Sequence, residues 1–291
     1  YPDIKYFFVP GIEGFIPYIR NNDLTLGACE PVCDQEDIYL LAKLFLEFSL
    51  RETEYVGFIP VSERTQPILK AIGFDSISIG KEPIFDLNNL KKQGRKVRGN
   101  INRAKKKGLK VVPFNSMYEK DINKQSRKWK RTREMPAMQF LFELNPLELK
   151  EYKKYFLLVD NDNKLHAFLS CSPIFERNGW HLHDLVRDEN APHGCGELLI
   201  TSALNMLSEE GYSMASYGLA PLSKLPSADI NHPFVNKALR FSYEKLSFIY
   251  HFQSLEYFKD KFEPNHWEEN SFCFYPKKVK LKLANDLLKS F

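Results

Sequence analysis

The two halves of the sequence predict the same order of elements, and this repetition constrains the fold more than any other feature. Hydrophobic periodicity and turn residues predict a hairpin, a helix, a strand, a helix and a strand in each half. In the first half these are residues 15–29, 36–51, 56–60, 63–72 and 76–87, the last as two short strands at 76–80 and 83–87. In the second half they are residues 155–172, 196–210, 213–217, 236–245 and 271–275, with an additional strand at 180–187.

We therefore expect an α/β (α+β) fold built from two similar domains, since each half has an ordinary domain size. The first domain is assigned to residues 1–90 and the second to residues 113–291, with a basic helix at 91–112 between them. Hydrophobic residues make up 43% of the 291 residues and aromatic residues 14%, which is enough for a sizeable core and argues against disorder.

Positive charge is concentrated at the junction of the halves. Between Lys91 and Arg133 there are 17 Lys or Arg residues against two acids, a net of +15, so the remaining chain carries 4 − 15 = −11. A basic block on an otherwise acidic chain indicates a partner such as a polyanion. The candidate tRNA- or anion-binding residues are those of the basic helix: Arg95, Lys96, Arg98, Arg103, Lys105, Lys106 and Lys107.

The five cysteines are widely spaced and odd in number, which favours reduced thiols in the cytoplasm over a disulfide framework. Cys29 and Cys33 lack a second Cys/His pair nearby, so no metal site is predicted. No run of 18 apolar residues is present, and no membrane span is expected.

A charged pair ends the strand predicted at 180–187. Asp184 and Arg187 are three residues apart, so they point to opposite faces of the strand unless a bulge intervenes. One interpretation is a salt bridge or turn contact at the strand end. The other is a substrate-clamping arginine beside an acid that orients an amine.

A short glycine-rich loop follows this strand. His193-Gly194-Cys195-Gly196 faintly resembles the pyrophosphate loop of acetyl-CoA-dependent acetyltransferases, because two glycines let the backbone approach an anion at a helix N-terminus. Glu197 would stabilise the helix dipole as an ordinary acid of the first turn.

Two lysines stand near the end of the chain among aromatic residues. If the segment is a strand, Lys259 and Lys261 share one face, where they hold a phosphate or form a basic edge. The sequence has no nucleophile elbow, Walker loop, Rossmann fingerprint or kinase motif set, so a covalent serine mechanism is not supported.

Several blocks, in order and with matching spacing, resemble the C-terminal catalytic domain of lysyl- and alanyl-phosphatidylglycerol synthases, a tandem acetyltransferase-like (GNAT-like) family known as DUF2156. They are Leu26–Pro31, Gly80-Lys81-Glu82, Arg95–Gly108, Asp184–Arg187, Pro192–Glu197, Gly218–Ser223 and Lys259–Pro264, with Trp129 and Trp267 at matching places.

The resemblance implies two GNAT-like domains joined by the basic helix. It also implies a bacterial transferase that moves an amino acid from aminoacyl-tRNA to a hydroxyl of phosphatidylglycerol or a similar lipid. Donor and lipid would enter from opposite sides, with aminoacyl-tRNA as co-substrate and no other cofactor. The site residues that it implies are Asp184, Arg187, Glu197, Lys259 and Lys261.

Two alternatives stay open. One is an acyl-CoA-dependent GNAT N-acyltransferase, and the other is a non-catalytic module that binds tRNA or a membrane. An anionic phospholipid surface is the rival partner of the basic block. The expected location is the cytoplasm, with a peripheral position at the inner face of the membrane as the variant that a lipid acceptor favours.

Overall fold

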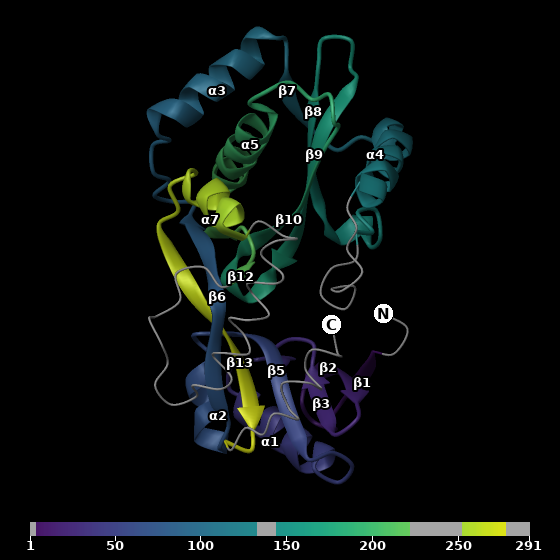
Figure 1. Cartoon of the computed structure of the whole chain (residues 1–291), viewed down its shortest axis with the longest axis vertical. Helices are drawn as coiled ribbons and strands as arrows, with labels where there is room; N and C mark the ends of the chain where they lie inside the picture. Colours follow the sequence, from purple (N-terminus) through teal and green to yellow (C-terminus); the bar gives the residue numbers. More distant parts are fainter. Residues whose placement is uncertain (1–3, 133–143, 222–251, 278–291) are drawn as a thin grey trace.

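The computed structural model describes residues 4–132, 144–221 and 252–277, and their strands form one mixed sheet (Figure 1). The strands are β1 Lys5–Phe7, β2 Gly14–Asn21, β3 Leu24–Gly27, β4 Val32–Cys33, β5 Tyr55–Ser62, β6 Asp75–Asp86, β7 Lys110–Pro113, β8 Lys154–Val159, β9 Leu165–Ile174, β10 Gly179–Arg187, β11 Met214–Ser216, β12 Ala220–Pro221 and β13 His266–Tyr275. The helices are α1 Ile38–Ser49, α2 Gln66–Ile72, α3 Arg95–Lys106, α4 Glu119–Thr132, α5 Cys195–Glu209 and α7 Phe252–Asp260. Along the sheet the order is β1-β2-β3-β5-β13-β6-β11-β10-β9-β8-β7.

The first half follows the sequence closely. β2 and β3 form the expected antiparallel hairpin, and β5 adds to β3 in parallel after α1. α2 ends where Gly73 adopts a φ of 115°, a left-handed conformation that favours glycine. α1 and α2 pack over one face of these strands around Phe45 and Phe58.

One expectation about the first half was wrong. The two short strands at 76–80 and 83–87 are a single strand, β6, which pairs with β13 over most of its length. Gly80 interrupts the sequence pattern with a φ of 139°, but the register shift of β13 between Asn270 and Ser271 absorbs this irregularity. The long β6 therefore carries the sheet from one half of the molecule to the other.

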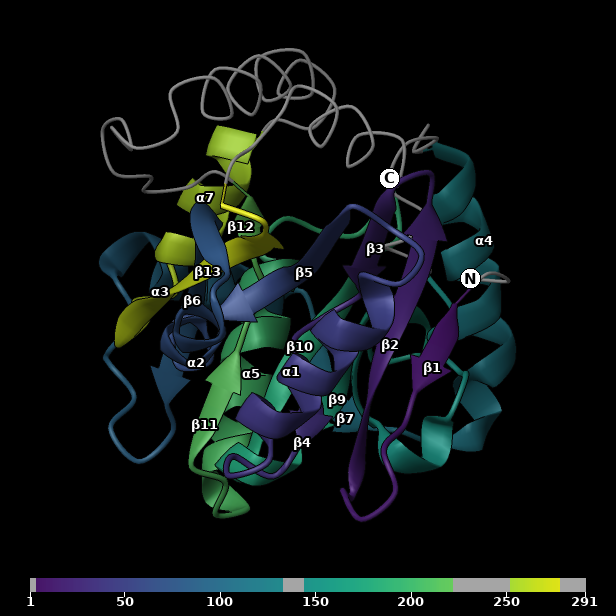
Figure 2. The same cartoon turned by 90° about the horizontal axis from the view of Figure 1, so that it is seen from below.

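The second half has helices on both faces of its strands. β8 and β9 form the expected hairpin, and β10 follows on the other side of β9. α5 packs on one face around Leu199 and Leu204. α4, which the sequence did not predict, packs on the opposite face through Ile122, so the sheet lies between the two helices (Figure 2).

The basic segment forms α3, which begins at Arg95 and packs on α5. Its buried residues, Val97, Asn100 and Ala104, form a narrow stripe along one side of the helix. At Gly194, with a φ of 92°, a Cβ would lie 2.3 Å from the Asn100 carbonyl oxygen. The two helices can approach this closely only because Gly194 has no side chain.

The C-terminal strand returns to the first half. β13 lies between β5 and β6, whereas the preceding α7 lies beside the second half. The helix predicted at 236–245 falls outside the described residues. None of the helices in the described ranges is long and apolar enough to cross a bilayer.

Candidate functional site

The sheet opens between β10 and β11. These parallel strands pair only from Gly179 and Met214 to His181 and Ser216. β11 ends there, whereas β10 continues to Arg187. Lys259 of α7 and the chain after β11 meet beside this opening, where Lys259 contacts the backbone of Gly218 and Leu219.

Lys259 of α7 occupies this opening. It is 5% exposed, and its Nζ donates hydrogen bonds to the carbonyl oxygens of Gly218 at 2.8 Å and Leu219 at 3.0 Å. The Nζ also lies 5.3 Å from the centre of the Tyr217 ring. Burial lowers the pKa of Lys259 to about 7, an effect that the charge of Glu82 partly opposes. Near neutral pH this lysine can therefore hold or release a proton.

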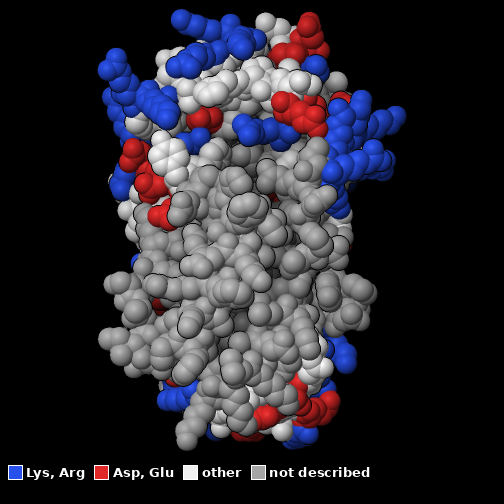
Figure 3. Space-filling model, viewed as in Figure 1, with Lys and Arg blue, Asp and Glu red and all other residues white. Residues whose placement is uncertain are grey.

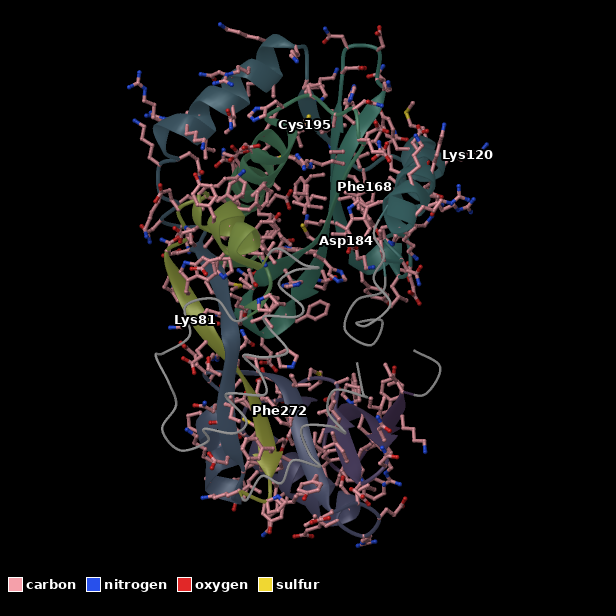
Figure 4. All side chains as sticks on the ribbon, in the orientation of Figure 1. Lys81, Lys120, Phe168, Asp184, Cys195 and Phe272 are labelled. Atoms are coloured by element: carbon pink, nitrogen blue, oxygen red, sulfur yellow. The ribbon has the colours of Figure 1, made fainter. Side chains whose placement is uncertain are left out.

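Asp184 lies on one face of the opening, near the centre of the molecule (Figure 4). It is 4% exposed, its Oδ2 accepts a hydrogen bond from Ser170 Oγ at 2.8 Å, and its Oδ1 has no hydrogen-bond partner among the described residues. Burial and, second, the charge of Asp184 raise the pKa of Tyr155 to about 12. A buried carboxylate oxygen that receives no hydrogen bond from the protein is suited to accept a hydrogen bond from a ligand.

A bulge places Asp184 on this face. The register between β10 and β9 shifts between Leu182 and Asp184, so Asp184 lies opposite Ser170 and on the same face as His181. The His181 and His183 rings are 5.7 Å apart, and His183 Nδ1 is 3.7 Å from Asp184 Oδ2. The bulge therefore gathers two histidines and an acid that a regular strand would divide between its faces.

Further polar residues continue this row across the neighbouring strands, although no pattern in the sequence marks them as a group. Ser216 Oγ donates a hydrogen bond to Glu82 Oε2 at 2.9 Å and lies 3.4 Å from His181 Nδ1. Glu268 is the register partner of Glu82 on β13. We call the row Glu268, Glu82, Ser216, His181 and Asp184 the polar face.

One end of the polar face is neutralised within the protein. Arg177 donates two hydrogen bonds to Glu268, at 2.6 and 2.8 Å. Burial alone would raise the pKa of Glu268, but the hydrogen bonds and charge of Arg177 outweigh it and lower that pKa. This pair joins the end of β9 to β13 and hence the second half of the molecule to the first.

Arg187 lies on the other face, as the spacing from Asp184 predicted. A Cβ placed on Gly196 would lie 3.9 Å from Arg187 Cδ and 3.6 Å from Phe258 Cζ, so Arg187 and α7 flank the same position. The pKa of Tyr217 is raised by burial and is lowered in part by Arg187, whereas the Lys259 ammonium lies over the Tyr217 ring. The fold thus brings Arg187 and Lys259 to the same tyrosine across 72 sequence positions.

Lys261 and Glu197 are partners of each other. Their Nζ and Oε1 atoms are 2.9 Å apart, and Asn100 Nδ2 donates to the same oxygen at 3.0 Å. Burial raises the pKa of Glu197, but these hydrogen bonds outweigh the effect and lower it. α7 is a helix and not a strand, so the expectation that Lys259 and Lys261 share a strand face was wrong. Lys261 instead ties α7 to α3 and α5.

The glycine-rich loop lies under α3. Gly194 caps the N-terminus of α5, and Cys195, at the start of the helix, is fully buried. Because the backbone of Asn100 lies against Gly194, α3 occupies one side of this N-terminus. In the described ranges no group of three or more His, Cys, Asp and Glu side chains could hold a metal ion.

The basic block forms two surfaces (Figure 3). All seven basic residues proposed from the sequence are exposed on α3 or at its end. The other basic residues lie mostly on α4, across the sheet, where Lys128 and Trp129 line a small pocket at the end of β10 together with Asp188. One net charge of +15 in the sequence therefore corresponds to two separate surfaces.

Comparison with known proteins identifies the family of this chain. Residues 1–274 match the model of the family described as "Phosphatidylglycerol lysyltransferase, C-terminal". The chain is 25% identical over 284 residues to a phosphatidylglycerol lysyltransferase of Staphylococcus xylosus, an alignment that covers 91% of this chain and 32% of that protein. It is 24% identical over 281 residues to the same enzyme of Staphylococcus aureus, with 91% and 32% covered. The chain thus spans about a third of the length of these curated relatives.

Solved structures share the fold. The C-terminal domain (DUF2156) of a putative lysylphosphatidylglycerol synthetase from Agrobacterium fabrum superposes with a TM-score of 0.80 at 20% identity, covering 98% of this chain and 87% of that one. L-PGS from Bacillus licheniformis gives 0.79 at 19% identity, covering 99% and 88%. The α/β class expected from the sequence is confirmed.

Proposed function

Because the chain belongs to the family of phosphatidylglycerol lysyltransferase C-terminal domains, we propose that it transfers an aminoacyl group from aminoacyl-tRNA to a hydroxyl of phosphatidylglycerol or a similar lipid. The observation that carries this proposal is the buried Lys259 in the opening of the sheet. It lies between a face that bears a carboxylate with an unpartnered oxygen and a face that bears Arg187. A transfer between two large substrates needs such a point, which each can reach from its own side.

In this reaction the lipid hydroxyl oxygen attacks the carbonyl carbon of the aminoacyl ester. The bond from that carbon to the ribose oxygen breaks, and the proton of the lipid hydroxyl passes to the ribose oxygen. Negative charge develops on the carbonyl oxygen during the attack. A fixed cation beside that oxygen stabilises the charge by up to about 3–4 kcal/mol in comparable settings.

We assign this electrostatic role to Lys259 in its protonated form. Asp184 accepts a hydrogen bond from the α-ammonium of the aminoacyl group through its unpartnered Oδ1. Arg187 binds a phosphate, either that of the terminal nucleotide or that of the lipid. Lys261 and Glu197 act by holding α7 against α5, because each is already bonded to the other.

The exposed residues of α3 are assigned to the tRNA backbone, since a basic helix neutralises several phosphates without reading sequence. We further propose that the architecture derives from two GNAT-like units joined by α3, and that the protein works in the cytoplasm at an anionic membrane surface. The supporting observations are the repeated element order and the two basic surfaces.

Product identification tests the proposal. The protein is incubated with lysyl-tRNA or alanyl-tRNA and phosphatidylglycerol vesicles, and the lipid fraction is analysed by mass spectrometry. An aminoacylated lipid should appear, and it should be absent with uncharged tRNA or with phosphatidylcholine vesicles. If no charged tRNA gives a product, the lipid aminoacyltransferase assignment fails.

A further inference from the structure

His181 is the last residue of β10 that pairs with β11, so its side chain stands where the two strands separate. Its register partner is Ser216, and the ring nitrogen Nδ1 lies 3.4 Å from Ser216 Oγ. The second ring nitrogen, Nε2, has no hydrogen-bond partner among the described residues. The histidine at the edge of the opening therefore has one nitrogen engaged by the protein and one that a ligand can use.

The hydrogen bonds of Ser216 fix which nitrogen of His181 carries the proton. A serine hydroxyl has one hydrogen to donate. Ser216 donates it to Glu82 Oε2 at 2.9 Å, and its Oγ accepts from the backbone N–H of Gly218 at 3.1 Å. In the contact with His181, Nδ1–H must then be the donor and Ser216 Oγ the acceptor. The lone pair of the neutral imidazole is therefore on Nε2.

The ring of His181 stays neutral at physiological pH. Burial and, after it, the charges of His183 and Lys259 lower the pKa of His181 to about 3. An imidazolium here would be a second buried cation beside Lys259. His181 is therefore suited to accept a hydrogen bond through Nε2, but not to store a proton.

Nε2 of His181 and the buried ammonium of Lys259 flank the same point. A Cβ placed on Gly218 would lie 3.6 Å from the one and 3.8 Å from the other. Two of the three N–H groups of Lys259 donate to the carbonyls of Gly218 and Leu219, and the third has no acceptor among the described residues. A donor and an acceptor side by side match the two oxygens of the proposed transfer, the carbonyl oxygen that gains charge and the hydroxyl oxygen that loses its proton.

We propose that His181 Nε2 accepts the hydrogen bond of the acceptor hydroxyl and orients its oxygen for attack on the aminoacyl ester, which makes His181 a further catalytic residue. This inference rests on the proposed function and assigns a residue to the attacking oxygen. Ser216 and Glu82 are positioning residues, because they hold the ring in the Nδ1–H tautomer. The hydroxyl proton still passes to the ribose oxygen, and His181 ends the reaction unchanged.

Nitrogen NMR of the whole chain with 15N-labelled histidine tests the tautomer without turnover. The His181 signals, identified by their loss in His181→Asn, should report a protonated Nδ1 and an unprotonated Nε2. Dihexanoyl phosphatidylglycerol should shift the Nε2 signal, whereas dihexanoyl phosphatidylcholine, whose headgroup has no hydroxyl, should shift it less. A protonated Nε2 would mean that Ser216 donates to the ring and that Glu82 carries the proton, and it would overturn the inference. An Nε2 signal that does not distinguish the two lipids would overturn it as well.

Two amide substitutions separate the roles of the two ring nitrogens in transfer. His181→Asn keeps an N–H donor near the place of Nδ1 for Ser216 but removes the acceptor at Nε2, so single-turnover transfer should be at least about tenfold slower. His181→Gln places an amide oxygen near the position of Nε2 and should recover most of that loss. The matched control is His166→Asn, which changes a histidine bonded to Asp160 outside the polar face and should keep the wild-type rate.

The two arms distinguish failure of this inference from failure of the proposed function. If His181→Asn transfers at the wild-type rate, or faster than His181→Gln, the ring serves the structure and the inference alone is refuted. If the Nε2 signal responds to phosphatidylglycerol but no charged tRNA gives a lipid product, the proposed transfer fails and the hydroxyl-binding role of His181 stands.

Discussion

Lys259 Nζ donates a hydrogen bond of 2.8 Å to the carbonyl oxygen of Gly218, just after the end of β11. This bond fixes a buried ammonium in the opening of the sheet. Gly218 has a φ of 69°, and a Cβ there would lie 3.1 Å from His181 Cε1 and 3.8 Å from Lys259 Nζ. The glycine therefore lets Lys259 and the polar face approach each other.

Replacement of Lys259 by methionine should abolish a pH dependence. The protonated form stabilises developing negative charge, and burial lowers the pKa of Lys259 to about 7. For the wild type we expect kcat/KM to fall as pH rises through about 7, after correction for spontaneous ester hydrolysis. Lys259→Met should be at least about tenfold slower at pH 6.5, equivalent to about 1.4 kcal/mol, and should lack this fall. An identical pH profile in the variant would assign the titration to another group.

The same lysine should make stability depend on pH. Its pKa is about 7 in the folded protein and about 10.4 in the unfolded chain, so between these values the unfolded state binds more protons. The free energy of unfolding therefore rises with pH between these two pKa values. Below pH 7 the buried charge of Lys259 destabilises the folded protein by its full amount. Urea unfolding should show Lys259→Met gaining stability relative to the wild type at pH 6 and losing that advantage by pH 10. A constant difference would contradict the lowered pKa.

Asp184→Asn should separate activity from stability. The amide is almost the same size and keeps a carbonyl oxygen for Ser170, but it loses the charge proposed to hold the α-ammonium. Transfer should fall at least about tenfold, while the thermal midpoint stays unchanged or rises, because a buried carboxylate oxygen without a partner is removed. A large loss of midpoint together with activity would instead indicate that Asp184 supports the fold.

Glu197→Ala should mainly reduce stability. It leaves the buried Asn100 amide without its partner and Lys261 without its carboxylate, for which a loss of about 1–3 kcal/mol is typical. Glu209→Ala, an exposed acid in the last turn of the same helix, is the matched control and should change stability by less than about 0.5 kcal/mol. Equal stabilities in urea would show that the Lys261 contact is not structural.

Charge reversal on the two basic helices should have different effects on tRNA. Lys105→Glu, Lys106→Glu and Lys107→Glu together should weaken tRNA binding and reduce the slope of log affinity against log salt by roughly 2–3, since each contact contributes about 0.7–0.9. The matched set on α4, Lys120→Glu, Lys124→Glu and Arg127→Glu, should leave that slope close to the wild-type value. Filter binding at several salt concentrations measures both, and the reverse pattern would move the tRNA site to α4.

Local signals in the sequence predicted much of the fold. The first hairpin turns at Asn21-Asn22-Asp23 and α2 ends at Gly73, and residues of these types act within one turn, so both boundaries follow from local sequence. α4 was missed because polar Gln125 and Ser126 are buried in it beside Ile122, which weakens its apolar periodicity. The alternation of lysine and phenylalanine near 260 resembled a strand. The segment is helical at Lys259 instead, and tertiary contacts hold it there, because Phe262 packs in the core and Lys259 bonds to the Gly218 carbonyl.

Part of the candidate site could also be predicted from the sequence. The resemblance drew attention to Asp184, Arg187 and Lys259, and the structure places them around one opening. Glu268, Ser216 and Arg177 stand on separate elements and meet only through strand order. No local pattern encodes such long-range register, so these residues could be found only from the folded chain.

The most direct test of the central claim is single-turnover transfer by wild type and Lys259→Met. Preformed protein–lysyl-tRNA complex is mixed with phosphatidylglycerol vesicles, and lysylated lipid is quantified over time by mass spectrometry. We expect product from the wild type and a rate at least about tenfold lower for the variant, with equal tRNA binding by both. Equal transfer rates would show that the opening between β10 and β11 is not where the aminoacyl group changes carriers.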